Sequence, residues 1–279
     1  MKTILRGKTK EVIISTEGSF IIIGESINPT GRKKLEDTLS ENNFDYVLEL
    51  AGKQIDEGAD ILDVNVGFTG VDELNLLPDT VKAINEKHDI PLCIDSPNPK
   101  AIEAALKVAD GKCIINSING EEKSLSTVLP IALQYGAAVI GLTMDDEGIS
   151  HLPEKRLRIA EKILDRAIKI GIKENDVIID PLVLAVSADP GAALVTLETI
   201  RLVHQKLSLN IIQGTSNISF GLPGRDTING VFMTFSILNG LTCAIANPAQ
   251  MTSVVRAADL LRGRDDYAMR FVEYFQGSL

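Results

Sequence analysis

Phe20–Ile23 is a run of four apolar residues, and it passes directly into the polar segment Gly24–Ser26. A continuously apolar run is typical of a parallel strand that is buried on both faces. We therefore expect a first strand over residues 19–27. The same change, from an apolar stretch to a polar cluster and then to helical periodicity, occurs eight times along the chain.

The spacing of these eight units indicates the fold. The seven further strands are expected at about 59–66, 90–95, 112–118, 137–144, 176–182, 209–216 and 242–246. Eight strand-helix units in roughly 250 residues predict an α/β fold, the closed (β/α)8 or TIM barrel, with its chemistry on the loops that follow the strands. No linker or shift in composition interrupts the pattern, so we expect one domain over residues 1–279. Residues 1–18 predict a short N-terminal hairpin that turns at Thr16–Gly18 and covers one end of the barrel.

Composition excludes several classes of function. A formal net charge of −10 argues against nucleic acid as the main ligand, because phosphate binding needs clustered Lys and Arg. Cys93, Cys113 and Cys243 have no metal-ligand spacing and lie in apolar runs, so we expect small core residues. Their odd number, without a signal peptide, favours a reducing cytoplasm. No apolar stretch is long enough to span a bilayer, so no membrane association is expected.

The polar clusters that end the strands are rich in Asp and Asn and contain no His. They are Gly24–Ser26, Asp63–Asn65, Asp95–Ser96, Asn116–Ser117, Thr143–Asp145, Asp180–Pro181, Ser216–Ser219 and Asn247–Pro248. A site built from carboxylates and amides suits a flat, nitrogen-rich ligand better than a metal or a hydrolytic nucleophile. We therefore expect no metal site.

Asp95, Asn116 and Asp180 would lie at similar heights on the catalytic face. Each could instead be a turn former that bonds nearby backbone amides. Together they would match a pterin, whose ring N–H and exocyclic amine point the same way and can both donate to one carboxylate. A second carboxylate and a carboxamide can then bind the remaining polar atoms of the ring.

Other polar residues could add contacts to such a ligand. Glu25, Asp63 and Asn65 either touch it or hold neighbouring loops at the barrel mouth. Asn217 can donate and accept hydrogen bonds, Ser219 lies in the same loop, and Arg225 is a surface residue or meets an anionic tail. The three histidines lie in helices or in a loop and are not expected to be catalytic.

The sequence resembles the pterin-binding methyltransferases, namely the methyltetrahydrofolate–corrinoid protein methyltransferases and the folate module of cobalamin-dependent methionine synthase. The matching runs occur in family order across about residues 20–250: Ile23–Asn28, Leu62–Gly67, Cys93–Ser96, Ile115–Ser117, Gly141–Met144, Ile179–Leu182 and Ser216–Ser219. The resemblance implies that Asp95, Asn116 and Asp180 bind the pterin. It also implies that Asn217 is the catalytic residue, which contacts N5, the atom that carries the transferred methyl group.

The activity that the resemblance implies is methyl transfer between the cobalt of a corrinoid protein and N5 of tetrahydrofolate. Tetrahydrofolate and 5-methyltetrahydrofolate would be substrates, and a separate corrinoid protein would supply the corrinoid and dock on the open face of the barrel. We expect a cytoplasmic homodimer. The favoured direction is methylcorrinoid to tetrahydrofolate, as in a demethylation pathway; the alternative is transfer from methyltetrahydrofolate to a corrinoid iron-sulfur protein.

Two departures bear on this interpretation. Phe220 stands where the corrinoid-linked relatives carry a polar side chain, which removes an auxiliary hydrogen bond near N5. Dihydropteroate synthases, which are more distant relatives, carry basic residues after the seventh and eighth strands, whereas this chain has Ser216-Asn217 and Asn247-Pro248. A dihydropteroate synthase-like condensation and a non-catalytic folate-binding barrel are therefore the more distant alternatives.

Overall fold

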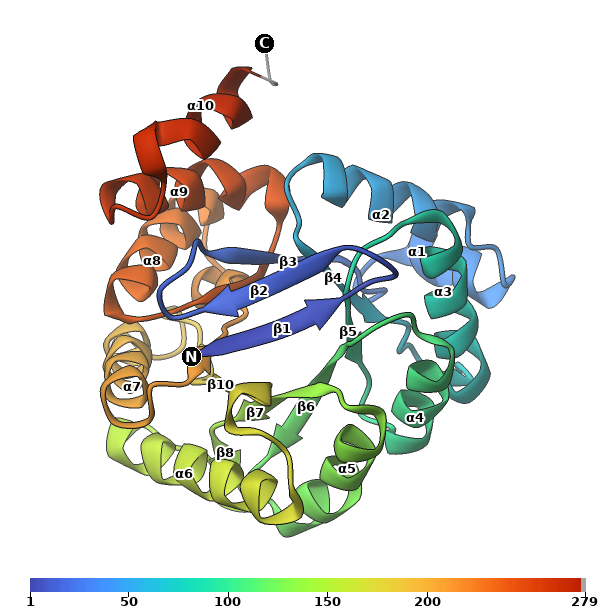
Figure 1. The fold of residues 1–279 in the computed structure, drawn as a ribbon, viewed down its shortest axis with the longest axis horizontal. Coiled ribbons are helices and arrows are strands. Elements are labelled where there is room, and N and C mark those ends of the chain that lie inside the picture. The colour runs from blue at the N-terminus through green and yellow to red at the C-terminus, as the bar shows by residue number, and fades with distance from the viewer. Residues whose placement is uncertain (277–279) are drawn as a thin grey trace.

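Eight parallel strands surrounded by helices form a barrel in the computed structural model, which describes residues 1–276 (Figure 1). The barrel strands are β3 (Ile21–Ile27), β4 (Ile61–Asn65), β5 (Leu92–Asp95), β6 (Ile114–Asn119), β7 (Ala138–Leu142), β10 (Val177–Asp180), β11 (Asn210–Ile211) and β12 (Cys243–Ala246). Their order in the sheet is β11-β10-β7-β6-β5-β4-β3-β12, and every neighbouring pair is parallel.

Backbone hydrogen bonds between β11 and β12 close the barrel. Thr242 N donates to Ile211 O at 3.1 Å, and Ile245 N donates to Gln213 O at 2.9 Å. A parallel bridge between Gly214 and Ile245 continues the contact. The predicted (β/α)8 barrel is confirmed. The expected seventh strand, 209–216, was too long, because the chain turns after Gly214 into the 3₁₀ helix η2 (Thr215–Ser219).

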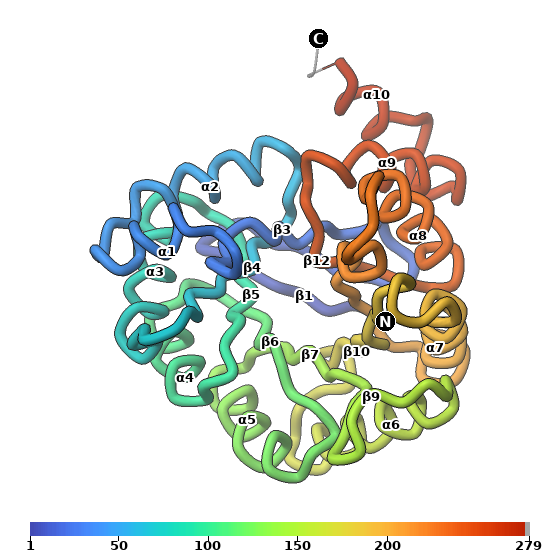
Figure 2. Tube along the Cα trace, turned by 180° about the vertical axis from the view of Figure 1, so that it is seen from behind, coloured from blue at the N-terminus to red at the C-terminus, as the bar shows by residue number. Residues whose placement is uncertain are grey.

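Helices pack around the outside of the strands (Figure 2). They are α1 (Lys33–Ser40), α2 (Asp45–Asp56), α3 (Glu73–Lys87), α4 (Pro99–Val108), α5 (Glu122–Tyr135), α6 (Pro153–Ile170), α7 (Ala192–Leu207), α8 (Arg225–Asn239), α9 (Pro248–Leu261) and α10 (Met269–Gln276). The last of these extends away from the barrel (Figure 1). None of the helices within residues 1–276 is long and apolar enough to cross a membrane.

A short antiparallel pair after β7 was not predicted. The strand expected over 137–144 ends at Leu142, and the pair β8 (Met144–Asp145) and β9 (Gly148–Ile149) follows. Gly148, the first residue of β9, has a φ of +83°, a conformation that glycine adopts at little cost.

The N-terminal hairpin consists of β1 (Lys2–Arg6) and β2 (Glu11–Ser15) and lies across one end of the barrel (Figure 1). The predicted position of its turn was wrong. The turn lies between the two strands, where Gly7 N donates to Lys10 O at 2.9 Å, and Thr16–Gly18 instead link the hairpin to the barrel. Asn210 Nδ2 donates to Ile14 O at 3.1 Å and so attaches the hairpin to β11.

The barrel interior follows the two-residue alternation of side chains along a strand. Inward residues near the hairpin are apolar and buried, and they pack with three residues of the hairpin itself. This inner cluster contains Leu5, Val12, Ile14, Ile21, Ile23, Ile61, Cys93, Ile114, Ala138, Ile140, Ile178, Ile212 and Cys243. The cysteines are unpaired and buried, as predicted. On β4, β5, β6 and β10, the residue two positions after the inward apolar residue is polar.

Gly111 provides a test of how tightly the hairpin is packed. Its φ is +72°, and a Cβ atom there would lie 2.2 Å from Arg6 O and 2.3 Å from Gly7 O. Gly111→Ala should lower the free energy of unfolding by about 2–5 kcal/mol, through the backbone conformation and the clash together. Urea-induced unfolding measures this loss.

Gly70→Ala is the matched control, because Gly70 has a φ of +85° with nothing within 4 Å of the added Cβ. It should cost only the backbone term, about 1–2 kcal/mol. Equal losses in the two variants would contradict close packing of the hairpin on the barrel.

Candidate functional site

A cavity of about 670 Å³ opens at the carboxyl ends of the barrel strands. Its walls come from strand ends, from the loop after β3, and from the first turns of α8 and α9. The lining residues are Glu25, Asn28, Thr30, Arg32, Asp63, Asp95, Asn116, Asp180, Gly214, Ser216, Asn217, Phe220, Arg225, Asp226, Asn229, Ile245, Asn247 and Gln250. Most carry polar side chains, so the cavity offers hydrogen bonds on nearly every side.

The ends of β4, β5 and β6 form a hydrogen-bonded carboxylate and amide group. The strand register pairs Asp95 with Asn65 on one side and with Asn116 on the other. Asn65 Nδ2 donates to Asp95 Oδ2 at 2.8 Å, and Asn116 Nδ2 donates to Asp63 Oδ1 at 3.2 Å. Asn65 Oδ1 accepts from Gly67 N at 2.7 Å. Asn65 thus lies behind the cavity wall and fixes the Asp95 carboxylate.

Burial disfavours charge on these two carboxyl groups. Desolvation raises the pKa of Asp63 above its ordinary value, and the nearby Asp95 carboxylate raises it further. Desolvation also raises the pKa of Asp95, although the hydrogen bond from Asn65 opposes the shift. Neither residue has a salt bridge to a Lys, Arg or His within residues 1–276. A ligand that donates N–H hydrogen bonds to these carboxyl groups would offset the loss of solvation of their charged forms.

Asp180 ends β10, with β7 lying between its strand and β6. Leu182 N donates to Asp180 Oδ1 at 2.7 Å, so one oxygen is held by the turn. Burial raises the pKa of Asp180 to about 7, against the lowering effects of that hydrogen bond and of Arg156. The predicted set of carboxylate, amide and carboxylate therefore faces one cavity.

The loop after β11 places Asn217 on the cavity wall. Asn217 N donates to Gly214 O at 3.3 Å, and a Cβ at Gly214 would approach Asn217 Nδ2 to 3.1 Å. A larger residue at Gly214 would therefore displace the Asn217 amide by a few tenths of an ångström. Arg225 holds this loop by donating to Ser219 Oγ at 3.0 Å and to Ser216 O at 2.8 Å. Ser219 is buried behind the wall, whereas Arg225 lines the cavity.

Glu25 also lines the cavity and reaches the same loop. Its Oε2 accepts a hydrogen bond from Ser216 Oγ at 3.3 Å. Burial raises the pKa of Glu25, and the hydrogen bond from Ser216 and the charges of Arg32 and Arg225 act in the opposite direction. Glu25 thus links β3 to the loop that carries Asn217 across the point where the barrel closes.

Several lining residues were not predicted. Arg32 comes from the loop after β3, where its Nη1 donates to Ser26 O at 2.6 Å. Asn229 and Gln250 come from α8 and α9; Asn229 is buried, and its Oδ1 has no hydrogen-bond partner in the described part of the chain. In sequence these residues look like ordinary loop or helix positions. A signal could have come from Asn229, an amide on the face of α8 that also carries Met233.

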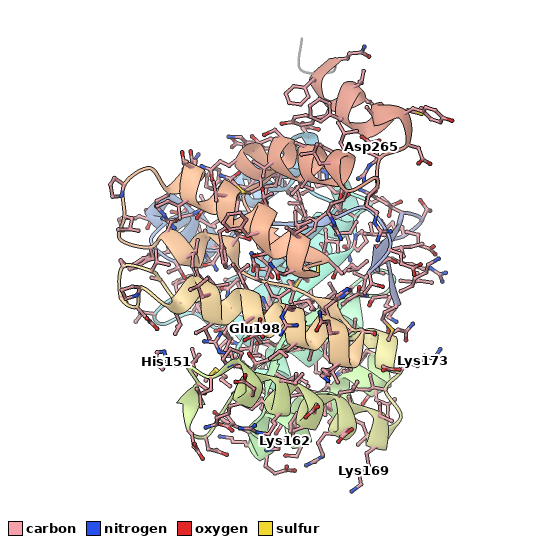
Figure 3. The ribbon with its side chains drawn as sticks, turned by 90° about the vertical axis from the view of Figure 1, so that its left-hand side faces the viewer. His151, Lys162, Lys169, Lys173, Glu198 and Asp265 are labelled. Carbon is pink, nitrogen blue, oxygen red and sulfur yellow. The ribbon has the colours of Figure 1, made fainter. Side chains whose placement is uncertain are left out.

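The histidines lie outside the cavity lining. His151 is at the same end of the barrel as the cavity, at the opposite end from Lys173 (Figure 3). Its Nδ1 lies 3.0 Å from Asp189 Oδ2, and its side chain is exposed. Over residues 1–276, no group of three His, Cys, Asp or Glu side chains is arranged to hold a metal ion.

Comparison with known proteins identifies the family. The model of the family described as "Pterin binding enzyme" matches residues 24–247. The chain belongs to this family. The resemblance that the strand ends predicted is therefore confirmed, as is the prediction of an enzyme.

Two named relatives of this pterin binding enzyme are similar over most of the chain. The methylcorrinoid:tetrahydrofolate methyltransferase of Eubacterium limosum is 30% identical over 267 residues, which cover 92% of this chain and 96% of that protein. The methionine synthase of Mycobacterium tuberculosis is 28% identical over 274 residues, covering 90% of this chain but 23% of that protein.

Solved structures share the barrel at lower sequence identity. The dihydropteroate synthase of Yersinia pestis with a pterin–sulfa conjugate has a TM-score of 0.71 and 16% identity, covering 94% of this chain and 99% of that chain. The dihydropteroate synthase of Clostridium difficile in the presence of pteroic acid has a TM-score of 0.69 and 20% identity, covering 88% and 98%. At this identity the likeness shows the fold alone.

The buried carboxyl group of Asp63 predicts a pH-dependent cost. Its raised pKa means that the folded protein keeps a proton that the unfolded chain, with a pKa near 3.8, has released. The stability linked to this group is thus present at low pH and is lost as pH rises through the raised pKa. Asp63→Asn keeps an acceptor for Asn116 and has no carboxyl group to ionise. Its free energy of unfolding relative to wild type should therefore rise by about 1–3 kcal/mol when the pH is raised from about 5 to about 9. Urea unfolding at both pH values measures this difference, and a pH-independent difference would contradict it.

Proposed function

We propose that this protein is a methyltransferase that moves a methyl group between a methylcorrinoid, carried by a separate protein, and N5 of tetrahydrofolate. The favoured direction is from methylcorrinoid to tetrahydrofolate. The observation that supports the proposal most strongly is the arrangement of Asp95, Asn116, Asp180 and Asn217 around one cavity of a pterin binding enzyme. The nearly full-length match to the Eubacterium limosum methyltransferase supports the corrinoid and the direction.

The buried carboxylates fit the donor edge of a pterin. The pterin ring presents a ring N–H and an exocyclic amine side by side, and one carboxylate accepts both. We assign this contact to Asp180, whose second oxygen has no hydrogen-bond partner among residues 1–276. Asp95 and Asn116 then bind the remaining polar atoms of the ring. A ligand without these groups would leave buried polar atoms unpaired, at about 1–3 kcal/mol each.

Asn217 is proposed to act at N5. Methyl transfer changes the charge and the protonation of this nitrogen, and a carboxamide can donate a hydrogen bond to it or accept one. Because Arg225 holds the backbone of this loop before the ligand arrives, only the Asn217 side chain has to adjust as the charge changes. The protein would also align the methyl group with the two atoms between which it moves.

The corrinoid protein would approach the open end of the cavity. Phe220 lines the cavity mouth, and 69% of its surface is exposed. In place of a polar side chain it offers an apolar surface beside Asn217, where a corrin ring must come close. Arg32 and Arg225 carry positive charge at the same mouth and suit the anionic tail of the folate.

We further propose that the protein is a homodimer and is located in the cytoplasm. α8 exposes the apolar side chains of Val231, Phe235 and Leu238 along one side. We propose that a second copy of the chain covers this apolar side in a homodimer. The unpaired cysteines fit a reducing cytoplasm.

A methyl-transfer assay tests the proposed activity in both directions. The protein is mixed with a methylated corrinoid protein and tetrahydrofolate, and the cobalt spectrum and methyltetrahydrofolate formation are followed. Demethylation of the corrinoid with formation of methyltetrahydrofolate is expected. Transfer only from methyltetrahydrofolate to cobalt(I) would reverse the direction, and no transfer either way would contradict the function.

Asp180→Ala should weaken tetrahydrofolate binding by about 2–4 kcal/mol, because two donors lose a charged acceptor. Calorimetry measures the affinity. Asp165→Ala, which removes an exposed carboxylate from α6 outside the cavity, is the control and should bind as wild type does. Unchanged affinity in a folded Asp180→Ala protein would remove Asp180 from the site.

Asn217→Ala should lower kcat by about 10–1000-fold, with a smaller effect on folate affinity, because its hydrogen bond strengthens as the charge at N5 changes. Steady-state kinetics with saturating corrinoid protein measure kcat. Asn239→Ala, at the end of α8 and outside the cavity, is the matched control. Normal turnover in Asn217→Ala would show that the amide has no part in the reaction.

A further inference from the structure

Arg156 is the largest fully buried side chain within residues 1–276, with 1% of its surface exposed. It lies in the first turn of α6, where the helix dipole disfavours a positive charge. No carboxylate of the described chain lies within salt-bridge distance of it. A buried cation without a direct anionic partner is costly, so its position needs an explanation.

Three backbone carbonyl groups accept the hydrogen bonds of Arg156. Its Nε donates to Ser150 O at 2.7 Å, and its Nη1 donates to Pro181 O at 2.6 Å and to Leu182 O at 2.7 Å. Pro181 and Leu182 directly follow Asp180 at the end of β10. The guanidinium therefore holds the turn that carries one of the cavity carboxylates.

Leu182 transmits this contact to Asp180. Its φ is +64°, a conformation that a side chain such as leucine rarely adopts, so the surrounding contacts must maintain it. Leu182 O accepts from Arg156, while Leu182 N donates to Asp180 Oδ1 at 2.7 Å. Arg156 thus holds the carbonyl group of Leu182, and the Asp180 carboxylate holds its N–H group.

We propose that Arg156 is a positioning residue, which orients Asp180 through the Pro181–Leu182 turn and favours its ionised form. The assignment of Asp180 to the pterin edge rests on the proposed function, but the effect of Arg156 on Asp180 does not. Arg156 does not line the cavity, so it acts on a ligand through Asp180 alone.

The groups around Asp180 act on its pKa in opposite directions: burial raises it, and the hydrogen bond from Leu182 N and then the charge of Arg156 lower it. Arg156 is the cation that opposes the effect of burial on Asp180. Asp189 and Asp180 both act on Arg156 as anions, and the Cys243 thiol of β12 also feels the Asp180 charge. The other acidic groups of the cavity are Asp63, Asp95 and Glu25, and burial raises the pKa of each of them. Without Arg156, only the hydrogen bond from Leu182 N would oppose the effect of burial, and a protonated Asp180 accepts the pterin donors poorly.

Direct titration of Asp180 in the ligand-free protein tests the proposal. Carboxyl carbon NMR, with the Asp180 resonance assigned by its absence in Asp180→Asn, gives the midpoint. In Arg156→Met the midpoint should rise by about 1 pH unit or more relative to wild type, because the opposing charge is lost. Arg156→Lys keeps the charge but not the planar fork, so a smaller rise is expected, and it serves if the Met variant does not fold.

Arg166→Met is the matched control from the same helix. Arg166 pairs with Glu122 at the surface and lies far along α6 from the turn, so the Asp180 midpoint should not move. The tetrahydrofolate affinity of Arg156→Met should recover towards wild type as pH rises, whereas a purely structural defect would lower it equally at every pH. An unchanged Asp180 midpoint in the folded Arg156 variants would overturn the proposal, whatever the ligand of the site.

Discussion

The site depends on the two-residue alternation of side chains in strands that are buried on both faces. Ile61, Cys93, Ile114 and Ile178 point into the barrel and form its apolar filling. Two residues later along the same strands, Asp63, Asp95, Asn116 and Asp180 must point the same way. The strands therefore place the polar groups directly above the apolar layer of the barrel interior. That layer excludes water from one side of the polar groups.

This placement has opposite consequences for stability and for binding. Burial raises the pKa of Asp63, Asp95 and Asp180, so ionised carboxylates are unfavourable in the empty protein. A ligand that supplies N–H donors removes that penalty, and part of its binding energy comes from doing so. Natural sites commonly give up stability in this way. Asn65 and Arg156 limit the cost from behind the wall by bonding Asp95 directly and Asp180 through its turn.

Much of this could be predicted from the sequence because it is local. Apolar runs, their spacing and the polar residues that end them determine the barrel and the strand-end groups such as Asp95 and Asn116. The seventh strand was predicted too long because apolar Ile212 continues beyond the last residue of β11, and the β8–β9 pair was missed because β8 begins only two residues after the end of β7. Asn229 and Gln250 were missed because helix packing brings them to the cavity, and Arg32 because the course of the loop after β3 does so. Arg156 gave no signal, since an arginine in an amphipathic helix normally faces solvent.

The central claim is that the carboxylates and amides that line the cavity bind the pterin ring with N5 at Asn217. A crystal structure of the complex with 5-methyltetrahydrofolate tests it most directly. The account predicts that the pyrimidine edge of the ring donates to Asp180, with Asp95 and Asn116 on the remaining polar atoms and the N5 methyl group facing the open mouth beside Asn217. A folate bound with its ring outside the cavity, or with N5 turned away from Asn217, would contradict the account.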